Sequence, residues 1–321
     1  MTATRTGIHA IVAKPRGFCA GVERAVRVVE LALEQYGPPV YVRKQIVHNL
    51  HVVERLRARG AVFVEELGEV PRGAIAVLSA HGSAPQVYGQ AGALDLRLID
   101  ATCPLVTKVH GEARRYVKQG YRIILIGHAG HDEVIGTMGQ APDRTVLIET
   151  LDDVARLALA PDEPGVILTQ TTLSQDDTQA LVDALRRRFP HLELPPSEDI
   201  CYATQNRQNA IKQVAGRLDL LLVVGSRNSS NSQRLTEVAR ARGVKAHLIE
   251  DAGQIDPRWL EGVACVGVSS GASVPDDLVE EVLVRLRRLG VTSWEEIDAP
   301  DEGVVFNLPP FTQLTRAGRG L

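Results

Sequence analysis

The sequence is poor in aromatic residues and cysteine, and it contains no long apolar run. Aromatic residues make up 4% of its 321 residues, and only four residues are cysteine. A membrane-spanning helix needs roughly 20 consecutive apolar residues, so we predict no membrane span. The N-terminal segment also lacks the apolar core of a signal peptide. We therefore expect a cytoplasmic protein, whose reduced cysteines are metal ligands or reactive thiols rather than disulfides.

Strong net charge and the common short catalytic motifs are also missing. The net charge is −3 with a pI of about 6.3, which disfavours nucleic acid as the main partner because phosphate backbones select basic surfaces. The sequence has no G-x-x-x-x-G-K-[ST], G-x-G-x-x-G, H-E-x-x-H or G-x-S-x-G. These absences argue against nucleotide binding, zinc peptidase chemistry and serine hydrolysis by the usual routes.

Short aliphatic runs alternate with helical patterns along most of the chain. Continuous apolar runs of this length are typical of parallel strands covered on both faces. The sequence therefore predicts an α/β protein. The expected strands are 8–13, 40–43, 74–78, 96–99, 122–126, 165–168, 220–224 and 264–268.

Three of the four cysteines recur in matching places. Cys19, Cys103 and Cys201 each lie at a loop-to-helix junction. A polar residue follows each at a similar distance: His48 after 29 residues, His131 after 28 and Asn231 after 30. This repeat predicts three pseudo-equivalent α/β units. We expect them at 1–100 (with the N-terminal strand), 101–198 and 199–290, followed by a C-terminal tail at 291–321.

A further polar loop follows in each unit, and every such loop comes directly after an expected strand. These loops contain His81, Thr171 with Thr172, and Ser273. Ligands of open α/β sheets bind beyond the carboxyl ends of the strands. Three such ends facing one point would form a central polar cavity.

The cysteine positions favour a metal cluster over a zinc site. Spacings of 84 and 98 residues do not match the close cysteine pairs of zinc fingers or the compact motif of ferredoxins. Three thiolates on a four-iron cluster would leave one iron open to a substrate oxygen. Cys265, inside an apolar run, is expected to be a buried strand residue instead.

Other polar residues of the loops suit an anionic substrate and a proton donor. His48, His81 and His131 occupy corresponding loops and are expected to donate hydrogen bonds or to bind metal. Glu133 follows His131 by two residues, and a carboxyl group in a cavity beside an anion tends to stay protonated, which suits a general acid. The Ser and Asn cluster at 228–232 suits phosphate oxygens.

These residues resemble one known family, the 4-hydroxy-3-methylbut-2-enyl diphosphate reductases (LytB/IspH). The resemblance covers about residues 10–310. The motifs that carry it are Gly17-Phe-Cys-Ala-Gly-Val-Glu-Arg-Ala25, Ile46-Val-His-Asn49, Ser79-Ala-His-Gly82, Asp100-Ala-Thr-Cys-Pro-Leu-Val106, Gly130-His-Asp-Glu133, Gly136-Thr-Met-Gly-Gln140, Thr169-Gln-Thr-Thr-Leu-Ser174, Ile200-Cys-Tyr-Ala-Thr204, Asn228-Ser-Ser-Asn-Ser232 and Gly271-Ala-Ser-Val-Pro275.

The resemblance implies a trefoil of three α/β units with small, mainly parallel sheets around a central [4Fe-4S] cluster. It implies removal of the substrate hydroxyl as water by two electrons and protons, giving isopentenyl or dimethylallyl diphosphate, with ferredoxin or flavodoxin as electron donor. Glu133, His131 and Thr171 would be catalytic, with Glu133 as the proton source. The implied cluster ligands are Cys19, Cys103 and Cys201, and the implied substrate-binding residues are His48, His81, His131, Thr171, Ser229, Ser230, Asn231 and Ser273.

The chain departs from the family pattern at a few positions, and two alternatives remain open. Asp132 stands where Pro is expected. Its charge is expected to affect the pKa of Glu133 and therefore the rate of the catalysed reaction. A non-redox iron–sulfur lyase of the quinolinate-synthase kind also combines three units with three cysteines. A zinc-stabilised binding module is the non-enzymatic alternative.

Overall fold

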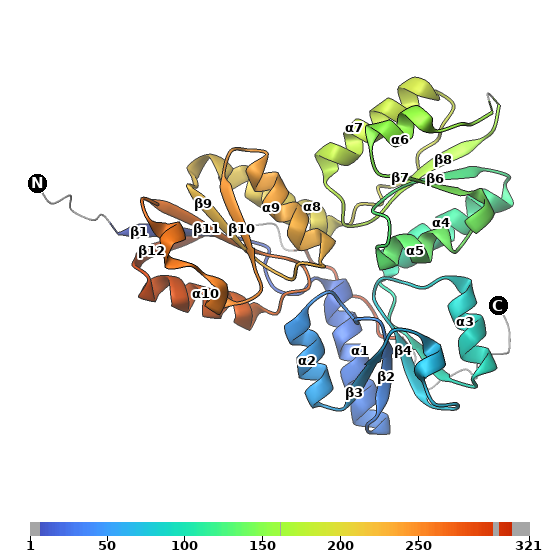
Figure 1. The fold of residues 1–321 in the computed structure, drawn as a ribbon, viewed down its shortest axis with the longest axis horizontal. Coiled ribbons are helices and arrows are strands. Elements are labelled where there is room, and N and C mark those ends of the chain that lie inside the picture. The colour runs from blue at the N-terminus through green and yellow to red at the C-terminus, as the bar shows by residue number, and fades with distance from the viewer. Residues whose placement is uncertain (1–6, 161, 298–301, 310–321) are drawn as a thin grey trace, which may run out of the picture. The chain divides into compact units, whose positions relative to one another are not determined.

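The β-strands of the described residues form three separate sheets (Figure 1). The computed structural model describes residues 7–160, 162–297 and 302–309. By their internal contacts these residues fall into two compact units. The first consists of the described parts of Met1–Cys19, His48–Leu50 and Tyr202–Val304, and the second of the described parts of Ala20–Val47, His51–Cys201 and Val305–Leu321. No helix among the described residues is long and apolar enough to cross a membrane.

The first unit contains one parallel sheet with the strand order β10-β9-β11-β1-β12. Its strands are β1 (Ile8–Ala13), β9 (Leu220–Val224), β10 (Lys245–Ile249), β11 (Cys265–Ser270) and β12 (Val291–Ile297). Its helices are α8 (Tyr202–Val214), α9 (Ser230–Arg240) and α10 (Asp276–Arg288).

This sheet is covered on both faces, which explains its continuously apolar strands. In β9, Leu220, Leu222 and Val224 pack with residues of α10. The alternate residues Leu221 and Val223 pack with α8 and α9 on the other face. Because successive side chains of a strand point to opposite faces, a doubly covered strand needs apolar residues at every position.

Two strands of this sheet correct the predicted unit boundaries. The N-terminal strand β1, expected in unit 1–100, pairs with β11 and β12 instead. The segment 291–321, expected to be a tail outside the repeat, begins with the edge strand β12. Sequence pattern identifies a strand but not its partner, and β12 is mostly exposed and polar. Residues 298–301 and 310–321 of the expected tail lie outside the described residues.

The second unit contains two parallel sheets, ordered β3-β2-β4-β5 and β7-β6-β8. The strands of the first are β2 (Val40–Arg43), β3 (Ala61–Val64), β4 (Ile75–Leu78) and β5 (Arg97–Asp100), and those of the second are β6 (Arg122–Ile126), β7 (Thr145–Ile148) and β8 (Gly165–Thr169). The helices are α1 (Ala20–Tyr36), α2 (Leu50–Ala58, which starts in the first unit), α3 (Pro85–Ala93), α4 (Pro104–Lys118), α5 (Asp132–Met138), α6 (Leu151–Arg156) and α7 (Gln175–Arg188).

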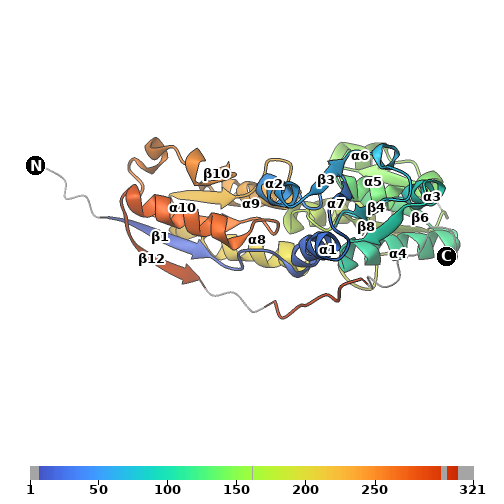
Figure 2. The same ribbon diagram turned by 90° about the horizontal axis from the view of Figure 1, so that it is seen from below.

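The sheet β7-β6-β8 is also covered by helices on both faces, like the sheet of the first unit. Ile124 and Ile126 of β6 pack with residues of α6 and α7, and Ile123 and Leu125 pack with α4 and α5. Figure 1 shows α6 and α7 on one side of this sheet and α4 and α5 on the other. Figure 2 gives the same elements from below.

The predicted polar loops all follow strands, at the carboxyl ends of β2, β4, β6, β8, β9 and β11. One hydrogen bond recurs between the two loop-bearing strands of each sheet. A backbone N–H just after the later strand donates to a carbonyl at or just after the end of the earlier one. The pairs are Ala80 N to Ile46 O (3.1 Å), Gln170 N to Ile126 O (2.8 Å) and Gly271 N to Val224 O (2.9 Å).

Candidate active site

Each of the three predicted metal ligands lies at the start of a helix. Cys19 immediately precedes α1, Cys103 is the N-cap residue of α4, and Cys201 immediately precedes α8. All three are half-buried, and no disulfide joins cysteines within the described part of the chain. A helix N-terminus favours negative charge, and therefore favours the thiolate form that binds metal.

The backbone of each cysteine is anchored in the same way. Its N–H group donates to a carbonyl in the polar loop after β11, β4 or β8. The hydrogen bonds are Cys19 N to Ala272 O (3.1 Å), Cys103 N to Ala80 O (3.0 Å) and Cys201 N to Thr171 O (3.0 Å). The equivalence of the three cysteines, inferred from spacing alone, therefore extends to their local hydrogen bonding.

In the first unit, His48 lies beside two loops that are distant in sequence. The Nδ1 atom of His48 is 3.4 Å from Nδ2 of Asn228. The hydroxyl of Ser273 donates to the carbonyl of His48 at 3.0 Å. Ser229 caps α9 by accepting the N–H of Ser232 at 3.3 Å. The unit thus brings together His48, Ser229, Ser230 and Ser273 at the ends of its strands.

Asn231, predicted to bind substrate, also joins α8 to the loop after β11. Its Nδ2 atom donates to the hydroxyl of Thr204 on α8 at 3.1 Å, close after Cys201. Its Oδ1 atom accepts the N–H of Ala272 at 3.0 Å. The carbonyl of Ala272 in turn accepts the N–H of Cys19. Sequence spacing did not reveal this structural role, because Thr204 lies 27 residues away.

In the second unit, His81 and His131 meet edge to face, with ring centroids 6.0 Å apart. His131 is the N-cap residue of α5, and its Nδ1 atom accepts the N–H of Glu133 at 3.2 Å. An Nδ1 atom that accepts a hydrogen bond leaves the proton of a neutral imidazole on Nε2. His131 can therefore donate a hydrogen bond through Nε2.

Close backbone packing at Gly82 positions the His81 loop. Gly82 has φ +81°, and a Cβ atom there would lie 2.6 Å from Cε1 of His110 on α4. Gln140 donates from Nε2 to the carbonyls of Ser83 (3.1 Å) and of Gly136 on α5 (2.9 Å). These contacts hold the loop that carries His81 against the helix that carries Glu133.

Glu133 is buried and bonded to Thr171. Its Oε1 atom accepts the backbone N–H of Thr171 at 2.7 Å, and its Oε2 atom lies 2.9 Å from the Thr171 hydroxyl. Only 3% of Glu133 is exposed. Desolvation by burial raises the pKa of Glu133 to about 7, although both hydrogen bonds from Thr171 oppose the shift. A carboxyl group with this pKa is protonated for a large fraction of the time near neutral pH.

The raised pKa gives stability a characteristic pH dependence. Folded Glu133 keeps its proton up to about pH 7, whereas the unfolded carboxyl loses it near 4.5. The contribution of the protonated Glu133 carboxyl to the free energy of unfolding is therefore complete below pH 4.5 and is lost as pH rises to 7. At about 1.4 kcal/mol per pH unit, we expect the free energy of unfolding to fall, between pH 5 and pH 7.5, by about 2 kcal/mol more in the parent chain than in Glu133→Gln.

Urea unfolding at pH 5 and pH 7.5, followed by circular dichroism, measures this difference. The exposed substitution Glu54→Gln is the matched control and should follow the parent. Equal pH dependence in the parent and Glu133→Gln would show that Glu133 titrates normally.

The adjacent Thr172 has a different set of contacts from Thr171. Its hydroxyl accepts from Nε2 of Gln170 at 2.8 Å, and Oε1 of Gln170 accepts the N–H of His128 at 3.0 Å. Gln170, 1% exposed, therefore ties the loop after β8 to the loop after β6. Sequence analysis assigned it no role, although it stands inside the quoted motif.

Cys265 lies at the amino end of β11, at the opposite end of the strand from the loop that carries Ser273. Its N–H donates to Oδ2 of Asp219 at 2.9 Å, and burial raises the pKa of its thiol. It is half-buried rather than fully buried, because it stands at the end of the strand.

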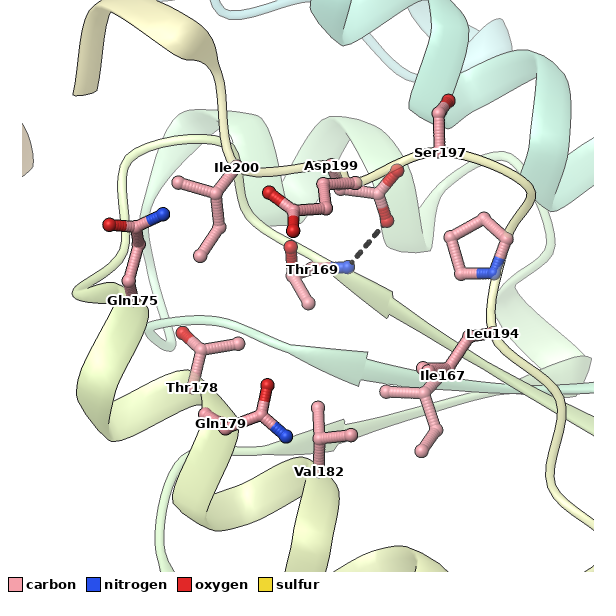
Figure 3. A pocket seen from close by; sticks show the side chains of 12 residues that line it. Ile167, Thr169, Gln175, Thr178, Gln179, Val182, Leu194, Ser197, Asp199 and Ile200 are labelled. Carbon is pink, nitrogen blue, oxygen red and sulfur yellow. Dashed lines mark hydrogen bonds between the residues drawn. The ribbon is translucent and has the colours of Figure 1, made fainter. Parts of the chain in front are cut away.

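A pocket lies between α7, β8 and the segment before Cys201 (Figure 3). Asp199 stands on its wall, and its Oδ2 atom accepts the N–H of Thr169 at 3.0 Å. The lining residues are Ile167, Thr169, Gln175, Thr178, Gln179, Val182, Leu194, Pro195, Ser197, Glu198, Asp199 and Ile200. The residues predicted for substrate and metal are not among them.

The fold and these residues define an α/β enzyme with three partly exposed cysteines at helix starts and a buried, readily protonated acid. The model of one family, described as LytB protein, matches residues 10–287. The chain belongs to the LytB family, which is a family of iron–sulfur oxidoreductases. The family and the fold class inferred from the sequence are thereby confirmed.

Similar proteins agree with this membership over nearly the whole chain. The 4-hydroxy-3-methylbut-2-enyl diphosphate reductase of Acidothermus cellulolyticus is 59% identical, covering 97% of this chain and 92% of its own. Reductase 1 of Rhodopseudomonas palustris is 53% identical, covering 93% and 97%. The solved structure of the Plasmodium falciparum reductase is 40% identical with a TM-score of 0.90, covering 95% of each chain.

Proposed function

We propose that this chain reductively dehydroxylates 4-hydroxy-3-methylbut-2-enyl diphosphate. Its relatives carry the name of that reductase, and one similar solved structure is titled the terminal enzyme of the non-mevalonate pathway. The main structural support is the buried pair of Glu133 and Thr171, joined by two hydrogen bonds. A largely dehydrated acid with a pKa near 7 suits proton delivery in a reaction that consumes protons.

The reaction consumes two electrons and two protons. The allylic carbon–oxygen bond breaks, and the hydroxyl leaves as water with one of the protons. The second proton forms a carbon–hydrogen bond at either end of the allyl group. The products are isopentenyl or dimethylallyl diphosphate.

Glu133 and Thr171 form the proton path in this proposal. The hydroxyl of Thr171 donates to Oε2 of Glu133 at 2.9 Å. When Oε2 carries a proton, the direction reverses and Glu133 donates to that hydroxyl. The Thr171 hydroxyl is then free to direct its own proton outward. The backbone N–H of Thr171 holds the other carboxyl oxygen, so the acid has one fixed orientation. His131 fixes the start of α5, which carries Glu133, and thus orients the acid as well as donating from Nε2.

We assign the diphosphate to the polar loops at the strand ends. Imidazole, hydroxyl and amide groups donate hydrogen bonds to phosphate oxygens, and the N-terminus of α9 adds a favourable helix dipole. The proposed donors are His48, His81, His131, Thr171, Ser229, Ser230, Asn231 and Ser273.

Cys19, Cys103 and Cys201 suit an iron–sulfur cluster. Each is half-buried, each stands where a helix N-terminus favours thiolate, and each has its backbone fixed by a loop hydrogen bond. We propose that these three thiolates hold a [4Fe-4S] cluster. When bound, the cluster supplies the electrons and an iron that acts as a Lewis acid toward the substrate oxygen. A ferredoxin or flavodoxin is the proposed electron donor, in the cytoplasm.

A viologen assay under anaerobic conditions tests the proposal. We expect the protein to oxidise reduced methyl viologen rapidly when 4-hydroxy-3-methylbut-2-enyl diphosphate is added and only at background rate without it. The same alcohol without its diphosphate serves as the control substrate and should react far more slowly. Unchanged viologen absorbance with a fully loaded protein would contradict the reductase function.

A further inference from the structure

Each helix that follows one of the three cysteines carries a basic residue about one and a half turns from its start. Arg24 is five residues after Cys19, Lys108 is five after Cys103, and Arg207 is six after Cys201. Each of these side chains donates at least one hydrogen bond to the protein backbone. Each one reaches backbone carbonyls in the loop that leads into a different cysteine.

Arg24 reaches the loop of Cys103. Its Nη1 atom donates to the carbonyl of Thr102 at 3.1 Å. The N–H and hydroxyl of Thr102 both bind Oδ1 of Asp100, at 2.9 and 2.5 Å. The residue before Cys103 is therefore held on both sides. Burial lowers the pKa of Arg24, and the electrostatic influence of Asp100 and Cys103 opposes that shift.

Lys108 reaches the loop of Cys201. Its ammonium group donates to the carbonyls of Ser197 and Glu198, both at 2.9 Å, and to Oδ1 of Asp199 at 3.0 Å. The Asp199 side chain is only 1% exposed, and its second oxygen accepts the N–H of Thr169 (Figure 3). The loop is thus fixed to α4 on one side and to β8 on the other.

Arg207 reaches the loop of Cys19. Its Nη2 atom donates to the carbonyl of Gly17 at 2.9 Å, and its Nη1 atom donates to the carbonyl of Ala203 on its own helix at 3.0 Å. Arg207 is only 1% exposed. A guanidinium is costly to bury without hydrogen bonds and a counter-charge, and Glu302 lies 3.5 Å from Nη1.

We propose that Arg24, Lys108 and Arg207 are positioning residues that fix the three cysteine loops in cyclic order. The helix after Cys19 holds the loop of Cys103, the helix after Cys103 holds the loop of Cys201, and the helix after Cys201 holds the loop of Cys19. Each cation donates to backbone carbonyls and so fixes the geometry of the loop. Groups that orient metal ligands are typically worth about 10–100-fold in metal affinity.

The cyclic order makes the inference specific, because each substitution should act on a loop distant in sequence. In Lys108→Met, we expect backbone hydrogen exchange to accelerate at least several-fold in the peptide spanning residues 197–201. Exchange in the peptide spanning 100–105, which carries the nearer cysteine in sequence, should stay unchanged. In Arg24→Gln the pattern should reverse. Exchange should be faster than in the parent at 100–105 and unchanged at 197–201. Lys118→Met, the same substitution on the same helix, is the matched control for Lys108→Met.

Only the predicted effect on iron affinity rests on the proposed function. Two measurements therefore test the positioning role and the iron–sulfur cluster separately. Hydrogen exchange of the metal-free chain tests the loops alone. Anaerobic reconstitution tests the consequence, and we expect iron affinity about 10-fold weaker in Lys108→Met than in Lys118→Met, with recovery in Lys108→Arg because the donor and charge return.

The positioning role and the proposed cluster are contradicted by different results. Equal exchange at 197–201 in Lys108→Met and Lys118→Met would overturn the positioning role. Faster exchange throughout α4 would also overturn it, because the effect would then be a general loss of stability. A parent chain that binds no iron while the exchange pattern holds would contradict the cluster and leave the cyclic positioning supported.

Discussion

Replacing Cys103 with serine is expected to remove most of the bound iron and at least about 100-fold of the reductase activity. A serine hydroxyl is a poor ligand for iron at neutral pH because it stays protonated, whereas the thiol of Cys103 lies at the N-terminus of α4, where thiolate is favoured. The measurements are iron and sulfide content and the visible spectrum of anaerobically purified protein.

Cys265→Ser is the matched control for this experiment. Cys265 has the same chemistry but lies at the amino end of β11, where burial raises the pKa of its thiol. We expect its substitution to leave iron content and activity near those of the parent. Loss of iron in both variants, or in neither, would refute the assignment of ligands. Anaerobic protein that binds zinc and never iron would instead favour a zinc-stabilised binding module.

Glu133→Gln is expected to keep the cluster and lose about 10²- to 10⁴-fold of turnover, the range that general acid catalysis usually contributes. Glutamine keeps the shape of the side chain and can still accept the N–H of Thr171, so the loop should hold its position. Its amide cannot release a proton to the substrate. The turnover number and the iron content of the same preparation together measure the effect.

The pH profile gives a second and independent sign of the same role. Because the pKa of Glu133 is raised to about 7, the fraction that carries a proton falls as pH rises through 7. We expect the parent turnover to fall over that interval and Glu133→Gln to lose this dependence.

Thr171→Val and Thr172→Val distinguish the proton path from a general effect of the loop. Thr171 binds Glu133 through its hydroxyl, whereas the hydroxyl of Thr172 binds Gln170. Thr171→Val should therefore slow turnover strongly, and Thr172→Val should change it much less. An equal loss in both variants, with normal iron content, would remove Thr171 from the proton path.

Sequence pattern predicted the buried strands well and the edge strands poorly. Strands β2, β6 and β9 have the predicted bounds, because burial on both faces demands an apolar residue at every position. Of the edge strands in the described residues, β3, β7, β10 and β12 were not predicted, whereas β5 and β8 were expected at 96–99 and 165–168. The strands β10 and β12 carry polar residues such as Lys245 and Glu295, which hide the apolar pattern.

For the candidate site, too, the sequence predicted some features and missed others. The repeat of Cys19, Cys103 and Cys201 and the family motifs supplied the residues to which we assign the chemistry. Neither could show that Asn231 holds the start of α8 or that Gln170 joins two loops. Such contacts join residues between 27 and 42 positions apart in the chain, and sequence spacing carries no record of them.

The sequence by itself determined the α/β class and the family, and it supplied the proposed thiol and acid residues. These depend on residue type and periodicity, which are properties of the chain alone. Only the tertiary structure decided that β1 joins the sheet of β9 and β11, that burial raises the pKa of Glu133 against the hydrogen bonds of Thr171, and that three cations donate to carbonyls of the cysteine loops. Strand partners, dehydration and long-range hydrogen bonds arise only when distant segments pack together.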